Sequence, residues 1–206
     1  MMRHIFEKGQ NPDAPTLLLL HGTGGTEHDL INVGKMISAE SSLLGVKGNV
    51  SEFGMARFFR RLSEGVFDEE DLILRTKELN EFLDESAKAY EFDRNNIVAV
   101  GYSNGANIAA SLLFHYQNAL AGAVLFHPMV PRRGIELPDL SGTSVFIGAG
   151  ENDPLVPLQE TKELAELLRD AKANVEVLFE QNGHQLSGNE VYAARDWLQK
   201  KFLKDK

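Results

Sequence analysis

Short, uninterrupted apolar runs recur along the chain, and most are flanked by glycine, asparagine or aspartate. They cover residues 17–20, 97–100, 123–126, 145–147 and 175–179. A strand buried on both faces of a sheet carries such a continuous run, whereas a half-exposed strand alternates between apolar and polar residues. The runs are short and rich in Val, Ile and Phe, so they predict strands of a buried sheet.

Three segments between or after these runs carry apolar side chains at helical spacing. They begin near Asp71, Pro157 and Ser187, with apolar positions at Leu72, Leu79, Leu83 and Tyr90, then Leu164, Leu168 and Ala171, then Val191, Ala194, Leu198 and Phe202. Pro157 suits a first helical turn, and Ser187 with Glu190 has the spacing of a capping box. Residues 106–116 are apolar nearly all round, which predicts a helix packed on most sides.

Alternating strands and helices predict βαβ units and an α/β fold, with a mostly parallel central sheet and helices on both faces. The 206 residues suit a single domain over positions 1–206. Ligands of such sheets bind at the carboxyl ends of the strands. The least regular stretch, residues 45–65, is the best candidate for a functional loop.

The composition of the chain excludes several classes of function. The net charge of −9 argues against binding nucleic acid, which needs a basic surface. The absence of cysteine excludes disulfides, thiolate zinc sites and a cysteine nucleophile. The first residues do not resemble a signal peptide, and no apolar run approaches the roughly 20 residues that span a bilayer. We therefore expect a cytoplasmic protein that does not bind membranes.

The strongest chemical signal is Gly101-Tyr102-Ser103-Asn104-Gly105, which follows a predicted strand and precedes a predicted helix. A sharp strand-to-helix turn needs small neighbours on both sides of the serine, and it lifts the hydroxyl to a helix N-terminus. Ser103 is therefore a candidate nucleophile. The alternative is a glycine-rich turn that contains a serine by chance.

A serine nucleophile needs a base and an acid that orients it, and in this kind of turn they follow in the order Ser, Asp/Glu, His. Asp153 comes shortly after the run at 145–147, and His184 follows the run at 175–179. We predict that His184 is the base and Asp153 the acid. Glu151 is a competing acid, and His127 shares the position after a strand, although a structural role fits it better.

The oxyanion of a tetrahedral intermediate needs N–H donors. One is expected from Asn104, directly after the nucleophile, and a second from the loop 22–25 after the first run. Thr23 is the preferred donor in that loop and Gly24 the alternative. As a phosphate loop it lacks the P-loop lysine, and Glu27 stands where a dinucleotide fingerprint has its last glycine.

Taken together, these residues resemble the phospholipase/carboxylesterase family of α/β-hydrolases, relatives of dienelactone hydrolases and acyl-protein thioesterases. The matching segments are residues 20–25 with Asp29-Leu30, the motif 101–105, Asp153 with Val156-Pro157, and Gly183-His184. The resemblance implies an α/β-hydrolase fold without a large lid, Ser103, Asp153 and His184 as a triad, donors at Thr23 and Asn104, and often a homodimer. Dienelactone hydrolases typically use cysteine, which this chain lacks, so the bacterial carboxylesterase branch fits better.

Residues 54–68 look like the variable arm beside the acyl pocket of such enzymes. On this interpretation the apolar site is walled by Met55, Phe58, Phe59 and Phe67. The alternative is that these side chains pack the arm onto the core. Arg57, Arg60 and Arg61 are expected to be solvated or ion-paired, although one of them could meet an anionic substrate group.

The sequence thus predicts hydrolysis of small carboxylic esters through an acyl-enzyme, with no metal or organic cofactor. The expected partner is a small-molecule ester, and a homodimer is possible. Two other functions stay open: a thioesterase or lysophospholipase for longer acyl chains, and a hydrolase-fold protein that binds a ligand without turnover.

Overall fold

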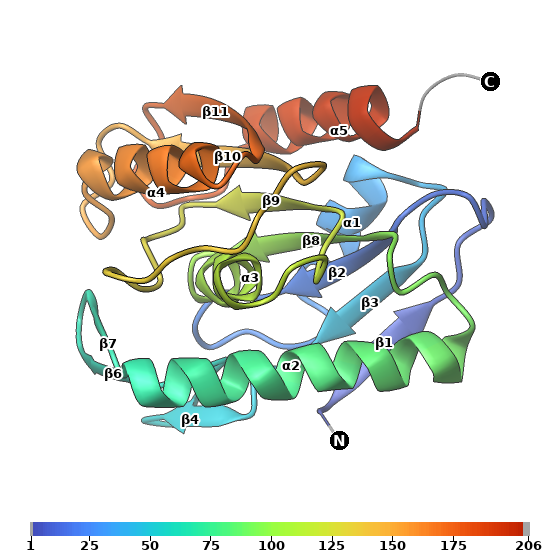
Figure 1. Cartoon of the computed structure of the whole chain (residues 1–206), viewed down its shortest axis with the longest axis horizontal. Coiled ribbons are helices and arrows are strands. Elements are labelled where there is room, and N and C mark those ends of the chain that lie inside the picture. The colour runs from blue at the N-terminus through green and yellow to red at the C-terminus, as the bar shows by residue number, and fades with distance from the viewer. Residues whose placement is uncertain (1, 204–206) are drawn as a thin grey trace.

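The computed structural model describes residues 2–203 and is built on one seven-stranded sheet (Figure 1). The strands lie in the order β1-β3-β2-β8-β9-β10-β11. Their bounds are His4–Glu7, Leu43–Val46, Thr16–Leu20, Ile97–Tyr102, Gly122–Phe126, Ser144–Gly150 and Asn174–Glu180. β1 runs antiparallel to β3, and every other pairing within this seven-stranded sheet is parallel. The α/β class and the mostly parallel sheet are confirmed.

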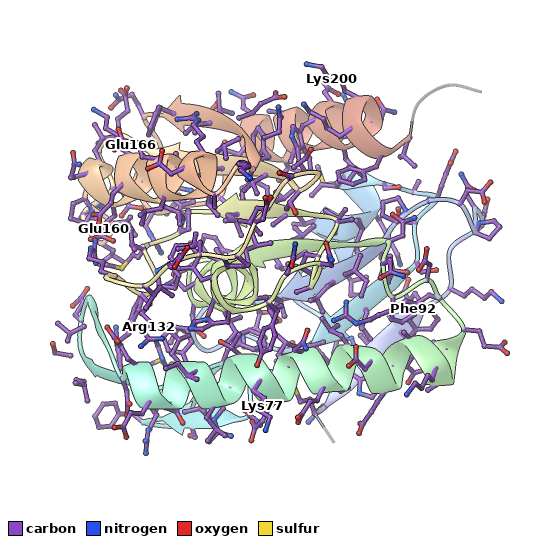
Figure 2. All side chains as sticks on the ribbon, in the orientation of Figure 1. Lys77, Phe92, Arg132, Glu160, Glu166 and Lys200 are labelled. Carbon is purple, nitrogen blue, oxygen red and sulfur yellow. The ribbon has the colours of Figure 1, made fainter. Side chains whose placement is uncertain are left out.

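Helices cover both faces of the sheet, as expected (Figure 1). One face carries α1 (Ile31–Ile37) and α5 (Gly188–Phe202), and the other carries α2 (Glu69–Tyr90), α3 (Asn104–His115) and α4 (Leu158–Asp170). Successive strand residues point to opposite faces. Leu18 and Leu20 therefore join the core under α2–α4, while Leu17 and Leu19 join the core under α1 and α5. Figure 2 shows side chains filling the space between the sheet and the helices.

The predicted strands and helices are all present, with two adjustments. β11 lies at the edge of the sheet and is only half buried, because just one neighbour, β10, pairs with it. Pro157 is the N-cap of α4 and not part of its first turn. The capping box of Ser187 and Glu190 is confirmed at the start of α5.

The stretch 45–65, predicted as an irregular loop, contains short strands. β4 (Val50–Glu52) pairs with β5 (Met55–Arg57), and β6 (Arg61–Ser63) pairs with β7 (Val66–Phe67). These two hairpins contain most of the arm predicted over residues 54–68, and from here on the arm means residues 50–67. It reaches the carboxyl ends of the strands, since Arg57, Arg61 and Phe67 line one cavity with Ser103. No helix within residues 2–203 has the length and apolar character to cross a membrane.

Close backbone packing at the start of α3 fixes where Ser103 lies. A Cβ at Gly105 would be 1.9 Å from the carbonyl oxygen of Leu20 in β2, and a Cβ at Gly101 would be 2.5 Å from the carbonyl oxygen of Gly105. The helix therefore touches the ends of β2 and β8 directly. Only glycine permits this approach.

We expect Gly105→Ala to destabilise the protein by about 3 kcal/mol or more, because the new methyl group would overlap the backbone carbonyls of Leu20 and His21. Gly188→Ala is the matched control, since the nearest atom to its Cβ is 4.0 Å away. The control should stay within about 0.5 kcal/mol of wild type. Chemical denaturation measures both, and equal stabilities would contradict the packing described.

Candidate active site

Ser103 stands at the turn between β8 and α3 in a backbone conformation that L-residues seldom adopt. Its φ is 52° and its ψ is −112°. The turn is held on both sides, because the Ser103 N–H donates to the Phe126 carbonyl (2.9 Å) and the Asn107 N–H donates to the Ser103 carbonyl (3.0 Å). Such strain is maintained only by surrounding structure, and it is typical of a nucleophile turn.

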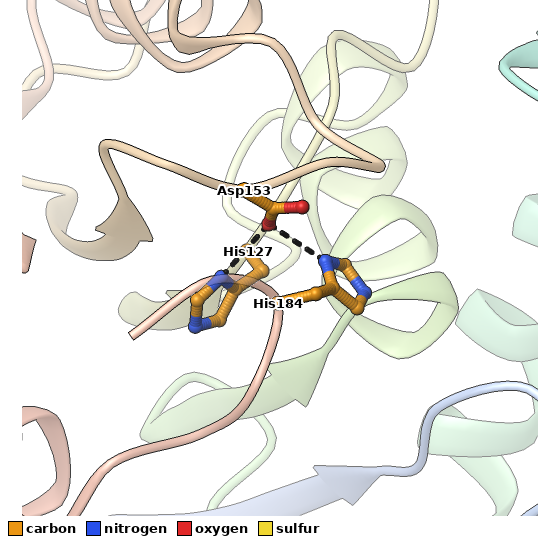
Figure 3. Close-up of side chains that lie close together, drawn as sticks. All are labelled: His127, Asp153 and His184. Carbon is orange, nitrogen blue, oxygen red and sulfur yellow. Dashed lines mark hydrogen bonds and ion pairs between the residues drawn. The ribbon is translucent and has the colours of Figure 1, made fainter. Parts of the chain in front are cut away.

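The structure brings Ser103, His184 and Asp153 into one hydrogen-bonded chain. Nδ1 of His184 lies 2.7 Å from Oδ2 of Asp153, and Nε2 lies 2.9 Å from Oγ of Ser103. A carboxylate oxygen only accepts, so Nδ1 carries a hydrogen and Nε2 of the neutral ring can accept the serine proton. Figure 3 shows the His184 ring turned toward Asp153.

Asp153 is held as a carboxylate although its side chain is only 1% exposed. Burial alone would raise its pKa. Hydrogen bonds from His184 and from the N–H groups of Leu155 and Val156 outweigh burial, so the pKa of Asp153 is lowered. The competing acid Glu151 is bonded to Gln181 at the surface instead. Of the two acids, only Asp153 contacts His184.

The arm is hydrogen-bonded to the loop that carries Thr23 and to the first residue of α3, Asn104. Nη1 of Arg57 donates to Oγ1 of Thr23 (2.6 Å), and the Gly24 N–H donates to the Ala56 carbonyl (2.8 Å). The Phe58 N–H donates to Oδ1 of Asn104 (2.7 Å). The N–H of Gly24 is therefore already engaged.

His21 holds the same loop through two hydrogen bonds. Nδ1 donates to the Gly22 carbonyl (2.6 Å), and Nε2 accepts from the Gly48 N–H (3.0 Å). Burial lowers the pKa of His21, which keeps the ring in the neutral form that this pair of bonds requires. The sequence did not single out this residue, since a histidine at a strand end carries no signal of its bonding.

A cavity of about 360 Å³ opens over Ser103. Of the four residues predicted to wall it, only Phe67 does so. Phe58 and Phe59 are 1% and 0% exposed and belong to the core under α2 and α3, where they anchor the arm. Met55 packs near Gly24 outside the cavity lining and is 40% exposed.

The three arginines of the arm differ in exposure, in ion-pair partner and in whether they line the cavity. Arg60 is exposed and pairs with Asp68 (3.1 Å), as expected. Arg61 pairs with Glu52 (2.9 Å) and lines the cavity. Arg57 also lines the cavity and is only 4% exposed, so of the two expected states, solvated or ion-paired, it has the ion-paired one. Its charge lies 3.6 Å from Glu52.

Within residues 2–203, one group of side chains has its ligand atoms close enough together to hold a metal ion: His127, Asp153 and His184, all within 4.8 Å (Figure 3). Both imidazole Nδ1 atoms face the same oxygen, Oδ2 of Asp153, at 3.1 and 2.7 Å. These are N–H to carboxylate hydrogen bonds, in which the nitrogen lone pair that a metal needs is occupied by a proton. The group is best described as a hydrogen-bond network.

Residues 62–194 match the family model described as the Dienelactone hydrolase family. The chain belongs to that family, and it is a carboxylic ester hydrolase of the dienelactone hydrolase/carboxylesterase type. MhqD of Bacillus subtilis (strain 168), which is named only as a hydrolase, is 57% identical over 202 residues, which are 98% of this chain and 100% of that protein.

The solved structures that are similar over nearly the whole chain include the following two. The Bacillus cereus carboxylesterase is 64% identical with a TM-score of 0.97, covering 98% of this chain and 95% of that one. YahD, solved with malic acid, is 31% identical with a TM-score of 0.92, covering 98% and 100%. The resemblance predicted from sequence is confirmed at the level of the family.

We expect Arg57→Met to loosen the loop 22–25, because it removes the guanidinium that donates to Thr23 and to the Phe59 carbonyl. Amide hydrogen exchange in that loop should accelerate by about tenfold while the sheet stays protected. Arg60→Met is the matched control, because its side chain is 63% exposed. Unchanged exchange in Arg57→Met would show that the arm does not hold the loop.

Proposed function

We propose that the protein hydrolyses small carboxylic esters through an acyl-enzyme on Ser103, with His184 as general base and Asp153 as the acid that orients it. The observation that carries the proposal is the unbroken chain from Oγ of Ser103 through His184 to the buried carboxylate of Asp153. That chain opens onto a cavity large enough for a small substrate.

In the first half-reaction, Oγ of Ser103 attacks the ester carbonyl carbon while Nε2 of His184 takes the hydroxyl proton. The carbonyl π electrons move to oxygen and form a tetrahedral oxyanion. When the oxyanion collapses, the bond to the leaving oxygen breaks, and the His184 imidazolium protonates the departing alcohol. Asp153 keeps the proton on Nδ1 and stabilises the imidazolium that forms in between.

Water then repeats the sequence on the acyl-enzyme. His184 takes a proton from water, the hydroxide attacks the acyl carbon, and Ser103 leaves with the proton returned from Nε2. The products are a carboxylic acid and free enzyme.

The oxyanion is proposed to bind two backbone N–H groups. Asn104 is the first residue of α3, where N–H groups lack helical partners and the helix dipole favours negative charge. For the second donor we favour Thr23 over Gly24, since the N–H of Gly24 donates to Ala56. Arg57 then contributes indirectly, because it holds Thr23 in place.

The cavity favours a short substrate with a polar or anionic group. Arg57 and Arg61 both line it and share one ion-pair partner, Glu52, and the acid Glu64 lines it as well, so the wall offers guanidinium donors to a polar or anionic group without a net positive charge. The structure of the relative YahD with malic acid agrees with this preference. The proposed partner is therefore a small-molecule ester.

We expect Ser103→Ala to abolish labelling by a fluorophosphonate probe and to lower ester turnover by about a thousandfold or more. Ser51→Ala is the control, because Ser51 is an exposed serine of the arm and should label like wild type. Equal labelling of wild type and Ser103→Ala would show that the nucleophile is another residue.

Hydrolysis of longer acyl chains is the second candidate, favoured by one feature. Leu155 lines the cavity yet is 48% exposed, so a longer chain would find apolar surface at the mouth.

The preference for short chains is tested with acetyl, butyryl and octanoyl esters of one alcohol. We expect kcat/KM to be highest for acetyl or butyryl and about tenfold lower for octanoyl, because 360 Å³ leaves little room for eight carbons. A steady rise with chain length would establish the long-chain alternative instead.

A further inference from the structure

A second histidine contacts the proposed triad and has no role in the mechanism above. His127 directly follows β9, has a φ of 53°, and its side chain is fully buried. Nδ1 lies 3.1 Å from Oδ2 of Asp153, the same oxygen that faces His184 (Figure 3). Nε2 lies 3.1 Å from Oε1 of Glu190, and its hydrogen bond runs to the other oxygen, Oε2, at 3.4 Å. Glu190 is buried as well.

The geometry decides the protonation of this ring. Each ring nitrogen faces a carboxylate oxygen, which can only accept a hydrogen bond. A neutral imidazole has one N–H and would turn a lone pair toward one of the two anions, at a high cost in a buried site. With both nitrogens protonated, His127 donates to both carboxylates, and this pairing raises its pKa against the effect of burial.

Both carboxylates are held in the ionised form by other donors. Glu190 accepts from the N–H of Ser187 (2.8 Å) and from Nδ2 of Asn182 (2.7 Å), and it lies in the first turn of α5, where negative charge is favoured. Asp153 accepts two backbone N–H groups and His184. Hydrogen bonds to both acids lower their pKa values although burial opposes it.

We propose that His127 is a permanently protonated positioning residue, which clamps Asp153 between α5 and His184 and adds a positive charge beside the base. The inference rests on the proposed function. The ionisable groups facing the His127 ring are Asp153, Glu190, His184 and Tyr102, with ring centroids 5.3 Å from His184 and 6.0 Å from Tyr102.

Two consequences follow for catalysis. The carboxylate of Asp153 cannot rotate without losing one of two N–H donors on Oδ2, so the His184 ring is held in line with Ser103. A second imidazolium, with its ring centroid at 5.3 Å, also adds positive charge beside the His184 ring.

The test is the pH profile of kcat/KM in His127→Gln and in the double variant His127→Gln/Glu190→Gln. The single variant leaves Glu190 as a buried anion without its cation, so it should be less stable than wild type. The double variant restores a neutral pair, and most of the stability should return. It therefore separates folding from catalysis.

We expect the acid limb of kcat/KM to move to higher pH by about one unit in His127→Gln, because the opposing charge is gone. In the double variant the acid limb should also move to higher pH, but by less. Glu190 lies on the far side of the His127 ring from Asp153, so the loss of its negative charge offsets only part of the loss of the His127 charge. His115→Gln is the matched control, because His115 bonds to Ser111 within α3, and its limb should match wild type. An unmoved limb in both folded His127 variants would overturn the proposal.

A measurement that does not depend on enzyme activity separates failure of this inference from failure of the proposed function. In nitrogen-15 NMR of histidine-labelled protein carrying Ser103→Ala, both ring nitrogens of His127 should stay protonated from pH 5 to 8. A neutral His127 at pH 7 would overturn the inference. If Ser103→Ala labels and turns over like wild type, the proposed function fails instead, and the charge state of His127 still stands on the NMR result.

Discussion

The packing of α3 against the ends of β2 and β8 is the constraint on which the site depends. Gly105 lies against the backbone of Leu20, and Gly101 lies against Gly105, so the helix start has no freedom to move away from the sheet. This contact exposes Ser103 above the sheet at a helix N-terminus. It also brings Asn104 next to the loop that follows β2, so that one contact positions both the proposed nucleophile and the proposed oxyanion donors.

Two buried histidines contact the site and differ in charge: His21 is neutral and His127 is protonated. Their hydrogen-bond partners explain the difference. His21 lies between a carbonyl and an N–H, which together require one proton on the ring. His127 lies between two carboxylates, which require two. His21 supports the loop that carries Thr23, and His127 supports Asp153. Burial is common to both rings, so the charge is decided by hydrogen-bond partners.

The elements that could be predicted from the sequence are those whose pattern is contained within a few neighbouring residues. Five strands appeared as continuous apolar runs, and Ser103, Asp153 and His184 followed from their places after strands in the expected order. β1, β3 and α1 were missed: β1 is a half-buried edge strand, β3 is broken by Gly45, and α1 has only seven residues. Phe58 and Phe59 were placed in the pocket because a sequence does not show which side of an arm faces the core. His127 and Arg57 acquire their roles only from long-range contacts with Glu190 and Thr23.

The most direct test of the central claim is to trap the acyl-enzyme. Wild-type protein is mixed with an activated acetyl ester, quenched in acid within the first turnovers and analysed by peptide mass spectrometry. The account predicts one acetyl group on the peptide containing Ser103, and no adduct once the ester is consumed. Turnover with the acetyl group on another residue, or with no covalent adduct at any quench time, would contradict it.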